Sequence, residues 1–290
     1  MSRDRLRGCL LGGALADALA FAHEGRAPGP VPELRVGAIS DDTQLTLAAC
    51  EALIADRGEV RPERVAEHLV LWHRRHGFVG LGASTAKALR ELSVGGHWAL
   101  VGRKGEMAAG NGAAIRIAPL AFVLDLASPR ARQVLRDVAR ITHHSDEAYV
   151  GALAIALVIR DALDHEWRGR DALFASLLDA LPDTRVRDRL SLVRGSTASI
   201  GELAREHGAT GYVVDAVPLA IHAYAWAAAS GDFSSMVRQL VEAGGDCDSI
   251  ASMAAQCLGA LRGESVLPQE LVARLPTIVS DTADRLGESV

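Results

Sequence analysis

Hydrophobic residues recur with a helical period along nearly the whole chain of 290 residues. No segment shows the strict alternation of apolar and polar residues that is typical of a half-buried strand. Aromatic residues make up only 4% of the sequence, so alanine, leucine and valine must supply most of the core. Small side chains let helices pack closely, and the sequence therefore predicts an all-α fold rather than a β-sandwich.

Glycine- and proline-rich stretches separate the helical segments, and none of them is long enough to be a linker between domains. We therefore expect one compact multi-helix domain over residues 1–290. Residues 21–37 form a loop. Residues 93–112 form a long loop, and a long loop in a compact domain is often a binding loop. The expected helices cover residues 3–21, 42–54, 62–76, 83–92, 113–126, 129–142, 146–162, 172–181, 184–193, 200–207, 214–229, 233–243, 250–261 and 268–286.

Composition and charge argue against several classes of protein. The net charge is −5 and the pI is about 6.1, whereas proteins that bind nucleic acids are usually basic, so we expect no nucleic-acid partner. The N-terminus lacks a secretory signal and no long uncharged apolar stretch follows, so we expect no membrane partner. The four cysteines (Cys9, Cys50, Cys247 and Cys257) show no CxxC spacing, which is typical of reduced core thiols in a cytoplasmic protein.

Two acidic clusters stand directly before helical segments. The first is "SDDT" at residues 40–43, and the second is "GGDCDS" at residues 244–249. Carboxylates and hydroxyls are the hard oxygen ligands that Mg²⁺, Mn²⁺ or Ca²⁺ prefer. The same residue types also cap helices and suit the positive end of the helix dipole. A helix needs only one capping acceptor, and two adjacent carboxylates repel each other. Both interpretations, helix cap and metal site, remain open from these residues alone.

Three further segments contain residue types that bind ligands. Gly110 and Gly112 flank Asn111, and glycines before a helix let backbone N–H groups approach an anion such as a phosphate. His143 lies before a helical segment, where a structural hydrogen bond is the commoner role of a histidine. Tyr212 offers a ring for stacking against a base. Each segment also fits an ordinary structural role, as a turn, a cap or a core side chain.

Together these segments resemble the ADP-ribosylglycohydrolase family, which includes dinitrogenase reductase-activating glycohydrolase and ADP-ribosylarginine hydrolase. The matching pieces follow the order of the family and span residues 8 to about 260. They are "GCLLGGALADALA" from Gly8, "SDDTQLTLA" from Ser40, "GNGAAIRIAPLAF" from Gly110, "ITHHSDEA" from Ile141, "TGYVVDAVPLA" from Thr210 and "GGDCDSIASMAAQCLGA" from Gly244.

The resemblance implies a single all-α domain with a cleft that binds two Mg²⁺ or Mn²⁺ ions and an ADP-ribosylated protein. The residues that match the metal ligands of the family are Ser40, Asp41, Asp42, Asp246, Asp248 and Ser249. The residues that match its substrate cleft are Gly110, Asn111, Gly112, Ala113, His143, Gly211 and Tyr212.

The reaction implied by the resemblance is hydrolysis of the bond between the anomeric carbon of the distal ribose and a side chain. A metal-held water attacks that carbon, and Asp41 or Asp246 takes its proton. Arginine is the favoured acceptor, and serine-linked ADP-ribose or a small-molecule ester is the alternative. A non-catalytic protein that binds ADP-ribose is the competing hypothesis.

The sequence departs from the family pattern at two places. The Gly-Asp-Ala-x-Gly of the first helix here has Ala16 and Ala20 in place of both glycines, while Asp17 is kept. Residues 80–85 lack the acidic residue and the asparagine of the arginine-directed members. In the serine-directed members a glutamate closes the site, and Glu24 and Glu33 are the two candidates for that residue.

Overall fold

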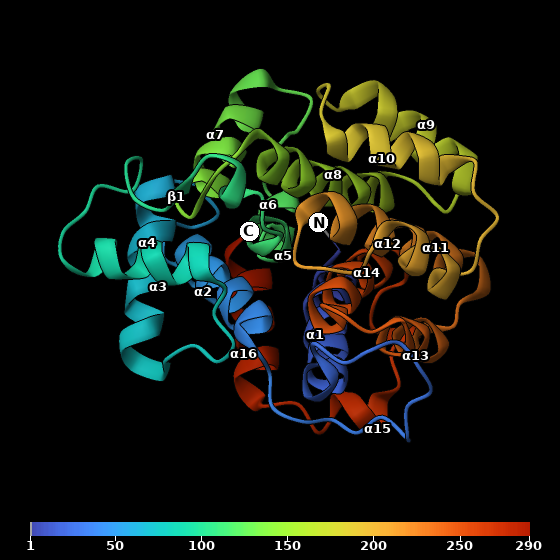
Figure 1. The fold of residues 1–290 in the computed structure, drawn as a ribbon. Coiled ribbons are helices and arrows are strands. Elements are labelled where there is room, and N and C mark those ends of the chain that lie inside the picture. Colours follow the sequence, from blue (N-terminus) through green and yellow to red (C-terminus); the bar gives the residue numbers. More distant parts are fainter. Residues whose placement is uncertain (1) are drawn as a thin grey trace.

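Helices α1 (Arg3–Ala20) and α14 (Cys247–Arg262) lie side by side at the centre of the molecule (Figure 1). In this computed structural model, which describes residues 2–290, they run antiparallel, because Gly8 packs against Gly259 and Gly12 against Ala255. All but four residues of α1 are buried, and every residue of α14 except Arg262 is buried. Few polar residues interrupt the apolar pattern of these two segments, because both helices are covered by other helices on nearly all sides.

The close approach of the two central helices depends on glycine. A Cβ atom added to Gly259 would lie 1.9 Å from the carbonyl oxygen of Gly8, and one added to Gly8 would lie 2.4 Å from the carbonyl carbon of Gly263. The two backbones are therefore in direct contact. This contact fixes the register of α1 against α14, and so sets where the end of one helix lies relative to the start of the other.

The other helices surround this central pair. Helices α2, α3 and α4 lie on one side, and α10 to α13 lie on the other (Figure 1). Helix α8 packs against both α12 and α14. The helices are α1 (Arg3–Ala20), α2 (Asp41–Ala55), α3 (Pro62–His76), α4 (Ala83–Ser93), α5 (Gly112–Ile115), α6 (Ala118–Ala121), α7 (Pro129–Arg140), α8 (Asp146–Asp164), α9 (Arg170–Ala180), α10 (Arg185–Arg194), α11 (Ile200–His207), α12 (Val213–Ser230), α13 (Phe233–Ala243), α14 (Cys247–Arg262), α15 (Gln269–Val272) and α16 (Thr277–Ser289), with short 3-10 helices at Phe21–His23, Glu106–Ala108 and Glu264–Val266.

The prediction of an all-α domain is confirmed, and two of the expected helices are interrupted. Residues 113–126 form the one-turn helices α5 and α6, because Pro119 lacks an N–H and occupies the first turn of a new helix. Residues 268–286 divide into α15 and α16, and Pro276 is the N-cap of the second. Proline therefore divides both segments that the helical period alone predicted to be continuous helices.

One short pair of strands was missed. Strand β1 (Arg103–Lys104) pairs in parallel with β2 (His143–His144), so that Arg103 lies opposite His143. Two residues are too few to show an alternating pattern. The pairing attaches the long loop over residues 93–112 to the segment that contains His143, and it places Arg103 next to His143.

A single hydrophobic core connects these helices, and it includes the four cysteines, all free and buried. Helix α12 is long and apolar enough to pass a length-and-composition test for a membrane span. Because 78% of that window is buried inside the protein and Pro218 lies within the helix, the apolar character of α12 reflects its place in the core.

The backbone contact between α1 and α14 predicts a large effect of a single methyl group. Gly259→Ala should lower the free energy of unfolding by about 1–3 kcal/mol, because overpacking forces the helices apart. Gly201→Ala is a matched control, since an added Cβ there meets no atom within 4 Å. It should leave stability unchanged or raise it by about 0.5–1 kcal/mol, because alanine favours helix. Urea denaturation measures both, and equal stabilities of the two variants would contradict the prediction.

Candidate active site

The carboxylate of Asp17 caps helix α2 from outside that helix. It accepts hydrogen bonds from the backbone N–H of Ser40 at 3.0 Å and of Thr43 at 3.3 Å, and also from the Thr43 hydroxyl. Ser40 is the N-cap of α2 itself, and its hydroxyl oxygen accepts from the N–H of Asp42 at 3.1 Å. Ser40 and Asp17 thus meet the capping needs of this helix end.

The side chains of Asp41 and Asp42 are consequently not needed to cap α2. Asp42 is buried, and its Oδ2 atom has no hydrogen-bond partner within residues 2–290. Asp41 is half-buried and lines a cavity. An unpaired carboxylate oxygen in the interior is strongly unfavourable unless a ligand compensates it. The two adjacent aspartates therefore face a ligand site rather than their own helix.

The second cluster has the same property. Asp246 stands at the N-cap position of α14 without a side-chain capping bond, and its Oδ2 instead accepts from Asn111 Nδ2 at 2.6 Å. Asp248 is buried, and its Oδ1 atom has no partner in the described part of the chain. The capping interpretation thus fails for the carboxylates of both clusters.

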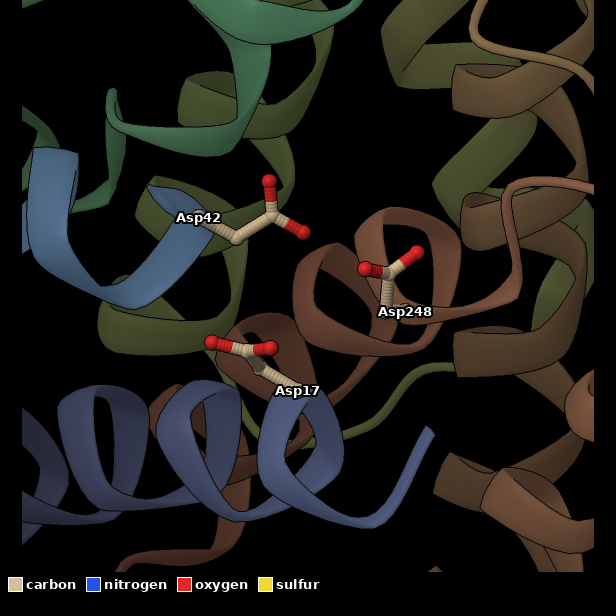
Figure 2. Close-up of side chains that lie close together, drawn as sticks. All are labelled: Asp17, Asp42 and Asp248. Atoms are coloured by element: carbon tan, nitrogen blue, oxygen red, sulfur yellow. The ribbon is translucent and has the colours of Figure 1, made fainter. Parts of the chain in front are cut away.

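Carboxylates from three helices point toward one another in Figure 2, which shows Asp17 on α1, Asp42 on α2 and Asp248 on α14. One oxygen atom of each lies within 4.8 Å of the others, and the same holds for a second group, Glu24, Asp246 and Asp248. The two groups share Asp248. The register of α1 against α14 brings Asp17 beside the second cluster.

Burial and mutual repulsion raise the pKa values of these groups. Burial, and then the charge of Asp17, raises the pKa of Asp41 to about 7. Burial, and then the charge of Asp246, raises the pKa of Asp248 to about 9. The pKa of Asp42 is also raised well above its usual range, first by burial and then by Asp248. Such a cluster attracts either protons or cations.

The donor set fits divalent cations of the Mg²⁺ or Mn²⁺ type. All ligands in both groups are carboxylate oxygens, with no soft sulfur or histidine nitrogen among them. The unpaired Oδ2 of Asp42 and Oδ1 of Asp248 are where such a cation would satisfy an oxygen that the protein leaves without a partner. Ser249 follows Asp248 in α14 and lines the same cavity.

The carboxylates open onto a cavity of about 460 Å³, a volume in the range of small-molecule sites. Ten residues that the sequence pointed to line it, and they are Asp41, Asp42, Gly110, Asn111, Gly112, His143, Gly211, Asp246, Asp248 and Ser249. Ser40, Ala113 and Tyr212 lie outside this lining. Ser40 caps α2 and Ala113 is fully buried. Tyr212 lines a second cavity, where its hydroxyl accepts from Arg185 Nη1 at 3.3 Å.

Backbone pairing between distant segments shapes the cavity wall. Asn111 N donates to Gly211 O at 3.0 Å, and Val213 N donates to Ala109 O at 2.9 Å. Asp246 N donates in turn to Ala209 O at 2.8 Å. The glycine-containing loop, the Gly211 turn and the second acidic cluster are therefore held as one unit, which explains how three separate sequence motifs meet.

Several lining residues were missed or left undecided by sequence reasoning. Gly25 N donates to Gly245 O at 2.8 Å, which places Glu24 at the cavity, whereas Glu33 is outside the lining. Arg103 also lines the cavity, and nothing in its local sequence marks it. Thr85 lines it too, and it belongs to the segment 80–85 that the sequence had singled out. Asp17 gave a usable signal, because it is a charged residue in the middle of an apolar, small-residue helix.

The chain is similar to known proteins along nearly its whole length. The family model described as ADP-ribosylglycohydrolase matches residues 1–290. ADP-ribosylarginine hydrolase Tri1 of Pseudomonas putida (strain GB-1) is 28% identical, covering 94% of this chain and 74% of that protein. The ADP-ribosyl-[dinitrogen reductase] glycohydrolase of Rhodospirillum rubrum is 25% identical, covering 94% and 90%. A solved structure titled ADP-ribosylglycohydrolase-related protein complex superposes with a TM-score of 0.75 at 28% identity, covering 99% and 98% of the two chains.

The raised pKa values predict that stabilisation by cations grows with pH. The ordinary pKa of Asp is about 4, so proton binding stabilises the fold below that value. This stabilisation is lost as the pH rises through about 7 for Asp41 and about 9 for Asp248. A cation binds the ionised forms. Mg²⁺ or Mn²⁺ at 100 times its Kd should raise the Tm by about 5 °C near pH 8, and by less near pH 5.5.

Thermal melts with cation and with chelator measure this difference. Asp248→Asn is the matched variant, because it removes one charge at nearly constant shape. Near pH 8 and in chelator, Asp248→Asn should have a higher Tm than the native chain. Added cation should raise the Tm of this variant by much less than it raises the Tm of the native chain. An increment in the native chain that is independent of pH would contradict the assignment of these carboxylates.

Proposed function

The chain belongs to the ADP-ribosylglycohydrolase family, and we propose that it removes ADP-ribose from modified protein side chains, with arginine as the favoured acceptor, in a reaction that needs two divalent cations. Membership of the family makes the chain an ADP-ribosyl hydrolase that acts on a glycosidic bond. The proposed need for divalent cations rests on one observation. Two groups of three acidic residues share Asp248 at the wall of one cavity, and some of their buried oxygens have no hydrogen-bond partner.

The carboxylates would hold the cations between the two acidic clusters. Asp17, Asp42 and Asp248 would form one group of ligands for Mg²⁺ or Mn²⁺, and Glu24, Asp246 and Asp248 would form the other. Such ions supply Lewis-acid chemistry that lowers the pKa of a water molecule and orients ribose hydroxyls. Asp17 also positions its neighbours, because it holds the start of α2 through Ser40 and Thr43.

Two carboxylates are placed to move a proton. Asp41 lines the cavity, and its pKa is raised to about 7, first by burial and then by the charge of Asp17. Asp246 is oriented by Asn111. Either would take one proton from the attacking water while the water oxygen bonds to the anomeric carbon. The departing acceptor keeps the electron pair of the broken bond and receives a proton in return.

The wall that contains the glycine loop would bind the nucleotide part of the ligand. Gly110 and Gly112 have no side chains to exclude a phosphate, and His143 lies against both. Arg103 is the one lysine or arginine of the described chain that lines this cavity. Because the diphosphate of ADP-ribose is an anion, it would lie on the Arg103 side of this wall, and Asn111 and Asp246 would lie between it and the remaining carboxylates.

The acidic cavity supports a cationic leaving group, and the relative from Pseudomonas putida is named for arginine. One observation favours the alternative of a serine-linked or ester-linked substrate. Gly80, Gly82, Ala83, Ser84 and Thr85 line the cavity without a carboxylate among them. The one carboxylate found beside this segment in the described residues is that of Asp41, next to Gly80, so a guanidinium group would have a single acidic partner here.

The deciding experiment is release of free ADP-ribose from arginine-, serine- and ester-linked substrates, each with Mg²⁺, with Mn²⁺ and with chelator. We expect cation-dependent release from the arginine linkage. Asp41→Ala and Asp248→Ala should each lower the rate by at least about 10³-fold, whereas Asp179→Ala, an exposed aspartate on α9, should be unchanged. Substantial activity in either site variant with cation binding intact would contradict its assigned role. Binding of ADP-ribose without release from any linkage would favour the non-catalytic hypothesis.

Arg103 should affect binding rather than chemistry. Arg103→Met removes the positive charge but keeps a long side chain, and it should raise the KM about tenfold, because a charge-assisted hydrogen bond to the diphosphate is lost. The kcat should change less than about twofold, since the guanidinium lies away from the carboxylates in this proposal. Arg103→Lys should keep much of the affinity. A fall in kcat at constant KM would place Arg103 near the reacting bond instead.

A further inference from the structure

Arg116 is a buried cation with an unusual set of partners. Its side chain is 1% exposed, and it forms no salt bridge within the described residues. Its Nη1 donates to the carbonyl oxygen of Gly112, while its Nη2 donates to Val138 O at 3.1 Å and to the hydroxyl oxygen of Thr142 at 2.8 Å. Burial lowers the pKa of Arg116 only to about 10, so it remains a positive donor at neutral pH.

The Thr142 hydroxyl connects this guanidinium to His143. Thr142 is fully buried, and its Oγ1 lies 2.6 Å from Nδ1 of His143. Because Arg116 already donates to this oxygen, the hydroxyl proton of Thr142 is free to point elsewhere. Nδ1 of His143 is its one recorded acceptor in the described part of the chain. If Nδ1 carried the proton instead, the buried hydroxyl would have no acceptor, which is unfavourable.

Burial and the neighbouring positive charges prevent the imidazole ring of His143 from carrying protons on both nitrogens. Burial, followed by the charges of Arg116 and His144, lowers the pKa of His143 to about 3. The ring is therefore neutral at physiological pH, with one donor and one acceptor nitrogen. Since Nδ1 accepts from Thr142, the proton resides on Nε2.

The Nε2 edge of His143 faces the cavity. A Cβ atom added to Gly110 would lie 3.1 Å from Nε2, and one added to Gly112 would lie 3.0 Å from Cε1 of the same ring. His143 lines the cavity, and its Nε2 has no hydrogen-bond partner within residues 2–290. The missing side chains of the two glycines leave this nitrogen accessible to a ligand in the cavity.

We propose that Arg116 and Thr142 are positioning residues that fix His143 as a neutral Nε2–H donor, which binds an oxygen atom of the ADP-ribosyl group. The proposal rests on the proposed function for the identity of the ligand, and on hydrogen bonding within the protein for the tautomer. It assigns His143 to recognition of a phosphate or hydroxyl oxygen. It excludes His143 both as a ligand of the cations and as the group that takes a proton from water.

The tautomer is tested directly by NMR on the intact protein with ¹⁵N-labelled histidine, in Mg²⁺-containing buffer. His143→Gln identifies the resonances of His143 by their loss. We expect Nδ1 to resonate as an unprotonated ring nitrogen and Nε2 as a protonated one, without titration near neutral pH. A protonated Nδ1 in the native chain would overturn the proposal, and this result does not depend on any ligand.

The binding consequence is tested with ADP-ribose as the probe, by calorimetry in the same buffer. Thr142→Val removes the hydroxyl at nearly constant shape and leaves Arg116 its bond to Val138. It should weaken binding about tenfold, the effect of one misplaced donor to a charged group. Thr142→Ser keeps the hydroxyl and should bind within about twofold of the native chain. Unchanged affinity in Thr142→Val would overturn the proposal.

A double variant separates positioning from general damage to the fold. His143→Leu should lose as much affinity as Thr142→Val, and combining the two should add no further loss, because Thr142 acts only through His143. Additive losses would show an independent structural role for Thr142 and overturn the proposal. Absence of ADP-ribose binding by the native chain would contradict the proposed function, and the NMR result would then still decide the tautomer.

Discussion

The site depends first on the backbone contact between α1 and α14 at Gly8 and Gly259. An added Cβ at Gly259 would lie 1.9 Å from Gly8 O, so no other residue permits this separation of the helices. The contact fixes an antiparallel register in which the C-terminal part of α1 lies beside the start of α14. Asp17 and Asp248 come together for that reason, although 230 positions separate them in the sequence. The carboxylate cluster that we propose as a cation site is thus brought together by the packing of two apolar helices.

The buried carboxylates where α1, α2 and α14 meet lower the free energy of unfolding when they are ionised. Each has its pKa raised by burial. In addition, Asp248 raises the pKa of Asp42, and Asp246 raises the pKa of Asp248. A cluster selected only for stability would replace some of these charges or pair them with arginine. The arginines of this protein mostly form exposed ion pairs or donate to carbonyl oxygens elsewhere, and the acidic groups keep unpaired oxygens. That arrangement favours the binding of protons or cations, and it is the basis for the cation site that we propose.

Much of the fold followed from the helical period, and the errors have local physical causes. Pro119 and Pro276 each start a new helix where the apolar pattern continues through them. The strands β1 and β2 are too short to show a pattern. Within the site, the acidic motifs were visible in the sequence because each has one carboxylate more than a helix cap needs. Arg103 and the capping of α2 by Asp17 were not visible, since each depends on a contact between segments far apart in the chain.

The distribution of charge in the cavity orients the ligand that we propose. The carboxylates gather where α1, α2 and α14 meet, whereas the wall formed by Gly110, Gly112 and His143 contains no carboxylate and has Arg103 beside it. An anionic diphosphate is repelled from the first region and accepted in the second. The distal ribose must then extend toward the carboxylates, which is where its anomeric carbon has to be cleaved. A neutral Nε2–H donor at His143 strengthens this orientation, because it binds oxygen without attracting the cations.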